Sequence, residues 1–169
     1  DIAARGCQVS LSCAGELVPL LRRIKGVSAT MAHGAETHVY HEAWVPAMSA
    51  VVPLGYEYEN LDGSAYLSMP SYKVPGARRI GLKWGGNPKF EHEQLRRFPP
   101  DSLWGLGFGA ADVFSLQKEF DGSGLPRLNM DTWEETASSI SSLDLVITSC
   151  TSIAHLAGAL GVETWVIVP

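Results

Sequence analysis

Polar residues that could bind a phosphate follow an apolar run near the end of the chain. Residues 143–161 read Leu-Asp-Leu-Val-Ile-Thr-Ser-Cys-Thr-Ser-Ile-Ala-His-Leu-Ala-Gly-Ala-Leu-Gly, and a second apolar run follows at 165–168. This pattern is typical of a strand, a tight turn, a helix and a second strand in a parallel sheet. Backbone N–H groups and the positive helix end at such a turn favour an anion. We therefore expect an anionic ligand there, and a phosphate is the best candidate.

Three side chains of this segment are candidate ligands. Thr151 and Ser152 stand at the start of the expected helix, and His155 lies in its first turn, nearly opposite the apolar stripe. A ligand-facing His155 would donate to a phosphate or polarise a leaving group, whereas the alternative is a solvated surface histidine. Thr151 and Ser152 are good helix N-caps whatever the function, so their types alone do not decide the matter.

Two further turns are expected at the same edge of the sheet. Gly85-Gly86-Asn87 follows the expected strand 79–84, with Arg96 and Arg97 nearby, and Gln117-Lys118 follows the expected strand 113–116. Glycines let a ligand approach the backbone closely, and arginine offers a planar fork to phosphate. The alternatives are a plain turn, a charged surface and a solvated lysine. Three polar turns at one edge favour a crevice more than any one of them does.

The cysteines admit a different chemistry. Cys150 stands near a helix start, which can lower a thiol pKa, and His155 could act as its base. An inert, packed cysteine is the alternative. The three cysteines do not form a disulfide framework, and they and the five histidines are not spaced as metal ligands. We therefore expect a reduced, cytoplasmic protein without a metal site.

Composition excludes several function classes. The 169 residues are 46% hydrophobic and 18% charged, with a formal net charge of -5. This supports a folded core and argues against a nucleic acid partner, because the basic residues are scattered. No apolar run approaches the roughly 20 residues that span a bilayer. The length allows one large domain or two small ones.

The remaining pattern predicts an α/β chain in two parts. Before a proline- and glycine-rich linker at 68–76, we expect strands at 7–12, 27–31 and 39–44 and helices at 16–24 and 46–54. After it, the strands named above alternate with helices at 100–106, from 133 and from 152. Asp131 or Thr132 would cap the second of these, with Glu134 or Glu135 completing a capping box. The order predicts a parallel sheet.

Five ordered segments resemble the carboxyl-terminal lobe of glycosyltransferase family 9. The similarity is strongest to the glycosyltransferase-like region that follows tetratricopeptide repeats in many bacterial proteins, and the lipopolysaccharide heptosyltransferases are better-known relatives. Residues 1–70 resemble the amino-terminal lobe more loosely. The segments are Arg-Ile-Gly-Leu-Lys-Trp-Gly-Gly-Asn-Pro (79–88), Arg-Phe-Pro-Pro (97–100), Ser-Leu-Gln-Lys (115–118), Asp-Thr-Trp-Glu-Glu-Thr (131–136) and residues 149–161.

The resemblance implies two Rossmann-like lobes of the GT-B type, here an acceptor-side lobe at 1–72 and a nucleotide-sugar-binding lobe at 73–169. It implies transfer of a sugar from a nucleoside diphosphate donor to an unknown acceptor, a glycan or a protein, without a metal or another cofactor. Carried over by position, the donor-binding residues are Gly86, Asn87 and Arg97 for the diphosphate, Thr151, Ser152 and His155 for phosphate and sugar, and Gln117 and Lys118 for the nucleoside.

Two departures from the family pattern limit this expectation. Cys150 stands where the family usually has Asp, and the family's catalytic base is an Asp in a glycine-rich loop after a first strand that has no counterpart before Cys7. We therefore expect a fragment truncated at both ends, which lacks the base and the activity, and we assign no catalytic residue. A missing strand would leave a sheet edge open, which predicts self-association.

Two alternatives belong to other classes. The chain could be a non-catalytic binding or scaffold module that keeps a degenerate glycosyltransferase fold. It could also be a cysteine-dependent hydrolase, which requires an exposed, reactive Cys150.

Overall fold

The first part of the chain forms a small two-stranded parallel sheet. The computed structural model describes residues 2–34, 39–71, 73, 75–118 and 122–168. After a 3₁₀ turn at Ala3–Arg5, strand β1 (Val9–Cys13) pairs with strand β2 (Val27–Ala32). The crossover between them holds a 3₁₀ turn at Gly15–Leu17 and the short helix α1 (Val18–Leu21). Gly26, just before β2, has a φ of 90°, a conformation that favours glycine, but α1 has already ended at Leu21, so Gly26 does not cap it.

The sequence predictions for the first part were only partly correct. The helix expected at 16–24 shrinks to α1, and the described part of 39–54 contains neither the strand expected at 39–44 nor the helix expected at 46–54. Between residues 39 and 71 the described elements are the 3₁₀ turns Ala47–Ser49 and Tyr58–Asn60. Tyr40, Trp44 and Met48 are 90%, 78% and 89% exposed. Short elements need tertiary packing to be stable, and these side chains have little of it.

The second part is a four-stranded sheet in which all strand pairs are parallel, as predicted. Strands β3 (Arg79–Lys83), β4 (Asp112–Ser115), β5 (Leu145–Ser149) and β6 (Glu163–Ile167) lie in the order β4-β3-β5-β6. Leu82 is in register with Ser115 on one side and with Ile147 on the other. Every residue of β5 is buried, because helices and loops cover both faces of the sheet.

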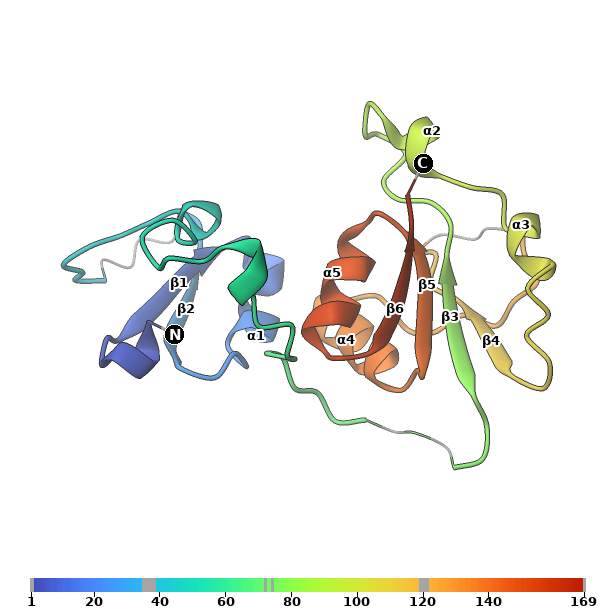
Figure 1. Ribbon diagram of the computed structural model, residues 1–169, viewed down its shortest axis with the longest axis horizontal. Helices are drawn as coiled ribbons and strands as arrows, with labels where there is room; N and C mark the ends of the chain where they lie inside the picture. Colours follow the sequence, from blue (N-terminus) through green and yellow to red (C-terminus); the bar gives the residue numbers. More distant parts are fainter. Residues whose placement is uncertain (1, 35–38, 72, 74, 119–121, 169) are drawn as a thin grey trace.

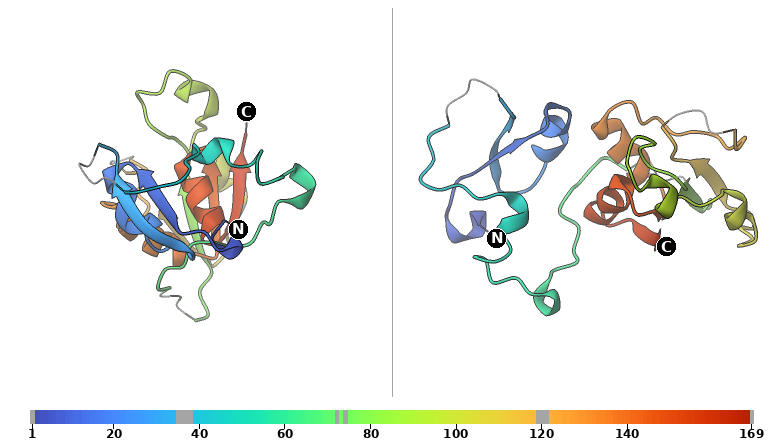
Figure 2. Two further views of the ribbon diagram at one scale, coloured as in Figure 1. Left: turned by 90° about the vertical axis from the view of Figure 1, so that its left-hand side faces the viewer. Right: turned by 90° about the horizontal axis from the view of Figure 1, so that it is seen from above.

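Helices cover the sheet unequally. α4 (Trp133–Ser141) and α5 (Ser152–Ala159) lie on the face toward the small sheet, as Figures 1 and 2 show. The opposite face packs against Leu103 of α3 (Asp101–Trp104) and against Phe98 and Phe108. The predicted capping box of α4 is confirmed, with Thr132 and Glu135 as its members. The four-residue helix α2 (Glu93–Arg96), which the sequence did not predict, projects beyond the carboxyl end of β3 (Figure 1).

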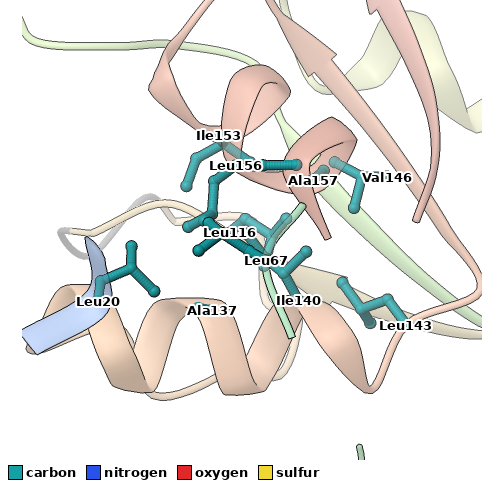
Figure 3. Close-up of a cluster of buried hydrophobic side chains, with 11 residues drawn as sticks. Leu20, Leu67, Leu116, Ala137, Ile140, Leu143, Val146, Ile153, Leu156 and Ala157 are labelled. Carbon is teal, nitrogen blue, oxygen red and sulfur yellow. The ribbon is translucent and has the colours of Figure 1, made fainter. Parts of the chain in front are cut away.

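Two leucines from the first part of the chain belong to the core of the second. Leu20 of α1 and Leu67 of the connecting segment are buried among side chains of α4 and α5, including Ala137, Ile140 and Leu156 (Figure 3). The backbone N–H groups of residues 66 and 67 both donate to the carbonyl oxygen of residue 159. The small sheet is thus joined to the large one through packing as well as through the chain.

The architecture is α/β with two parallel sheets, consistent with a Rossmann-like fold. The division into parts at 1–72 and 73–169 stays a prediction. β6 lies at one edge of the larger sheet, and its Trp165 and Val166 are 49% and 43% exposed. Within the described ranges, no helix has the length and apolar character needed to cross a membrane.

Candidate functional site

A cleft of about 1230 Å³ lies at the carboxyl ends of β3, β4 and β5. Its floor comes from the turns that follow these strands, and its other walls come from the start of α4, from Glu16 and from Pro19 of α1. The carboxyl edge of a parallel sheet is where ligands bind in open α/β folds, because the turns present free backbone groups there. This cleft is therefore the candidate site.

The predicted donor-binding residues are brought together here with one exception. Those that line the cleft are Gly86, Asn87, Arg97, Gln117, Lys118, Thr151 and Ser152. His155 does not line it. The imidazole is exposed on α5, while Ile153, Leu156 and Ala157 of the same helix are buried, so its predicted position opposite the apolar stripe is confirmed. A contact between His155 and a ligand would require that ligand to extend out of the cleft along α5.

A buried carboxylate that no sequence motif indicates lies against the glycine turn. Glu93 is 7% exposed, accepts a hydrogen bond from the Gly86 N–H, and accepts another from Arg96 Nε at 2.7 Å. Burial alone would raise the pKa of Glu93, but the hydrogen bonds from Gly86 and Arg96 and the positive charges of Arg96 and Arg97 outweigh it, and the pKa is lowered. Glu93 is therefore an anion at neutral pH.

Arg96 connects two of the turns at the sheet edge. Besides its bond to Glu93, its Nη1 donates to the carbonyl oxygen of Cys150 at 3.0 Å, and its guanidinium lies 4.4 Å from the centre of the Phe90 ring. The turn after β3 is thereby tied to the turn between β5 and α5. Arg97, the residue predicted to bind phosphate, is exposed and makes no hydrogen bond through its side chain to the described residues. Its guanidinium is available to a ligand.

Side chains of the protein itself lie close to the backbone of the glycine turn. A Cβ atom on Gly86 would come within 2.8 Å of Arg96 Nη2 and 2.9 Å of Glu93 Oε2. On Gly85 it would meet Glu93 Oε1 at 3.4 Å. Glycine was predicted here so that a ligand could approach the backbone, and in the structure a carboxylate of the chain itself makes that approach.

Lys83 is a second charged residue that was not among the predicted site residues. Its side chain is buried at the end of β3, and its Nζ donates to Gln117 Oε1 at 2.9 Å and to the carbonyl oxygen of Leu116 at 3.2 Å. Gln117 is thus held in place by a cation of the neighbouring strand. The sequence did contain an indication of this residue, because Lys83 stands in an otherwise apolar predicted strand and lysine is seldom buried unless its ammonium group is paired.

The turn before α5 leaves the helix start without a side-chain cap, although Thr151 itself is buried. Thr151 occupies the N-cap position, but its side chain makes no capping bond and instead shares a hydrogen bond of 3.2 Å with the Thr148 hydroxyl. No side chain therefore caps the first turn of α5, and its N–H groups and positive dipole end are directed toward the cleft. Ser152 at the helix start is exposed.

The charges that line the cleft are separated except for Glu93. The cations Lys83, Arg96, Arg97 and Lys118 lie at the end of β3 or after β3 and β4, with the Glu93 carboxylate among them, whereas the carboxylates Glu16, Asp131 and Glu134 belong to the wall formed by the first part and the start of α4. Glu134 also pairs with Arg23 at 2.8 Å. The cationic side suits an anion, and the acidic side can accept hydrogen bonds from hydroxyl groups.

The described residues offer neither a cluster of metal ligands nor an assembled cysteine nucleophile. Within the described ranges no group of three or more His, Cys, Asp or Glu side chains could hold a metal ion. Cys150 is exposed, and no hydrogen bond joins its thiol to His155 in the described structure. The pair required for a cysteine nucleophile is thus not assembled.

Comparison with known proteins found no similarity to set beside this geometry. No protein-family model matches the chain, and neither a curated protein nor a solved structure matches it. The resemblance to glycosyltransferase family 9 therefore stays a prediction that rests on the residues of this chain.

Proposed function

We propose that the cleft binds a nucleoside diphosphate sugar, as the donor site of a GT-B-type glycosyltransferase related to family 9. The observation that carries the proposal is the common location of its predicted ligands. Residues from three separate turns, assigned to the donor from the resemblance, line one cleft at the carboxyl edge of the sheet. The three free cysteines suit a reducing compartment, so we infer a cytoplasmic protein.

The cationic side of the cleft supports binding of the diphosphate. Arg97 offers an unengaged guanidinium, Lys118 a second exposed cation, and the start of α5 offers N–H groups without a side-chain cap. Arginine binds phosphate through two parallel hydrogen bonds, and a helix start adds a favourable dipole. During transfer these fixed donors would stabilise the charge that develops on the departing diphosphate.

The opposite walls of the cleft offer contacts for the nucleobase and the sugar of the donor. Pro19, Met130 and Trp133 supply apolar surface on which a nucleobase could lie, and Asp131 beside them could accept hydrogen bonds from sugar hydroxyls. The cleft volume of about 1230 Å³ exceeds the roughly 300–1,000 Å³ of ordinary ligand pockets, which is compatible with a ligand as large as a nucleotide sugar. We assign no described residue the role of catalytic base.

A non-catalytic binding module is the second candidate. It is favoured by Cys150, which stands where the resembled family usually has Asp. A thiol cannot replace a carboxylate as an acceptor of strong hydrogen bonds, so the fold could persist while transfer is lost.

Isothermal calorimetry with UDP, ADP and GDP tests donor binding. We expect one of them to bind, more weakly at higher salt because the attraction is partly Coulombic. Arg97→Ala should weaken binding by about 1–3 kcal/mol, and the matched control is Arg22→Ala, an exposed arginine away from the cleft. Failure of all three nucleotides to bind, or equal affinity of wild type and Arg97→Ala, would refute the proposal. Binding without hydrolysis or transfer of any nucleotide sugar would favour the non-catalytic module.

A further inference from the structure

We propose that Glu93 occupies the phosphate position of this cleft, and that a bound phosphate group must displace its carboxylate. The inference rests on the proposed function in one respect, since the displacing ligand would be the diphosphate of the donor. It goes beyond that function by assigning Glu93 the role of an internal competitor that sets the affinity of the site.

The described groups that hold the Glu93 carboxylate would also hold a phosphate. Oε1 accepts from the Gly86 N–H, and Oε2 accepts from Arg96 Nε at 2.7 Å. The positive charge of Arg97 acts on the same carboxylate. A backbone N–H next to a guanidinium is a general arrangement for binding an oxyanion, and it does not distinguish carboxylate from phosphate oxygens.

The carboxylate also lies where the ligand is expected. The family resemblance assigns Gly86 and Arg97 to the diphosphate, and both line the cleft together with Glu93. Oε1 and Oε2 of Glu93 are close to the Gly85 and Gly86 backbone, as the 3.4 Å and 2.9 Å separations from the hypothetical Cβ atoms show. A phosphate oxygen bonded to the Gly86 N–H would overlap the carboxylate, because one donor hydrogen cannot hold both at full strength.

The position of Glu93 allows it to leave. It begins the four-residue helix α2, which projects from the sheet (Figure 1). Its neighbours Gln94 and Leu95 are exposed. A change of side-chain rotamer or a small shift of α2 would carry the carboxylate into water without disturbing either core cluster. The competitor and its binding groups belong to one segment, so its local concentration is high and it lowers the affinity for every anion.

Calorimetry with inorganic pyrophosphate tests the inference. Glu93→Gln removes the charge but keeps the shape, and we expect it to bind pyrophosphate about 10- to 100-fold more tightly than wild type. The matched control is Glu91→Gln, which removes the same charge from an exposed position on the same loop and should leave the affinity nearly unchanged. Adding Arg96→Ala to Glu93→Gln should abolish the gain, because the freed guanidinium is then missing.

A measurement on the wild-type protein covers the case in which Glu93→Gln does not fold. In NMR spectra, saturating pyrophosphate should shift both the Gly86 amide signal and the side-chain carboxyl carbon of Glu93. Unchanged signals for these two groups, or equal or weaker pyrophosphate binding by Glu93→Gln, would overturn the inference. These results do not depend on the nucleoside, so the two proposals can fail separately. If wild type binds UDP without displacement of Glu93, the inference fails and the proposed function stands. If pyrophosphate displaces Glu93 but no nucleotide binds preferentially, the proposed function fails and the inference stands.

Discussion

Replacement of Arg96 by alanine should destabilise the protein by removing the link between two turns. Arg96 donates to Glu93 Oε2 and to the Cys150 carbonyl oxygen, so Arg96→Ala breaks both bonds at once. It also leaves the nearly buried Glu93 carboxylate with the Gly86 N–H as its remaining hydrogen-bond donor among the described groups. A buried charge that loses its partner is costly, because the lost solvation is no longer compensated.

The magnitude follows from the exposure of the two side chains. The Arg96 side chain is 25% exposed and that of Glu93 is 9% exposed, so water screens the pair only in part. A hydrogen bond to a charged group contributes about 1.5–3 kcal/mol, and the contact with the half-exposed Phe90 ring adds about 0.5 kcal/mol. We expect Arg96→Ala to lower the free energy of unfolding by about 2–3 kcal/mol at pH 7.

Urea unfolding followed by tryptophan fluorescence measures this effect, since the chain has five tryptophans. The control is Lys89→Ala, which removes an exposed cation from the same loop and should change stability by less than about 0.5 kcal/mol. A double-mutant cycle with Glu93→Gln isolates the pair, with an expected coupling of about 1–2 kcal/mol. If Arg96→Ala costs the same with Glu93 as with Gln at this position, the two side chains are not coupled and the reasoning is wrong.

Four further predictions concern other parts of the molecule. Gly81→Ala should cost about 1–3 kcal/mol in urea unfolding, because its Cβ would come within 2.6 Å of Leu143 and 2.7 Å of Leu116; no loss would show that the core yields easily. The pKa of Asp144 is lowered by the Arg79 N–H and by Lys73, so its contribution to stability is complete above about pH 4 and is lost as the pH falls through the lowered value. The stability difference between wild type and Asp144→Asn should therefore vanish in acid, and a difference that persists there would contradict this origin. His155→Ala should change stability by less than about 0.5 kcal/mol because the imidazole is exposed, and should weaken nucleotide binding less than Arg97→Ala does; an equal loss of affinity would show that the ligand reaches along α5. Among the described residues, each strand of the two-stranded β1–β2 sheet has one edge without a partner strand, which predicts self-association; light scattering over a concentration series checks this, and a constant monomer mass would refute it.

The elements that local rules determine were predictable from the sequence. α4 follows from its capping box, and the strand–turn–helix of β5 and α5 follows from an apolar run that ends in small polar residues. The common location of Gly86, Arg97 and Thr151 in one cleft was also predictable, because the carboxyl ends of parallel strands lie at the same edge of the sheet.

The groups that depend on tertiary contacts were not predictable. A charged residue such as Glu93 or Lys83 is by default exposed, and only the packed structure reveals which donors or acceptors surround it. Helix α2 is too short to be stable alone, and its first residue is anchored by bonds to Gly86 and Arg96. In 39–54 the sequence pattern was weak, and the described residues there pack against too little to form regular elements.

The burial of Leu20 and Leu67 also constrains the order of events during synthesis. Their partners in α4 and α5 lie near the end of the chain, so these leucines have nothing to pack against while the first part leaves the ribosome. The nascent first part is then an incomplete folding unit with uncovered apolar side chains, the kind of surface that chaperones bind. It can complete its packing only after translation has passed residue 159, whose carbonyl oxygen accepts hydrogen bonds from the backbone of residues 66 and 67.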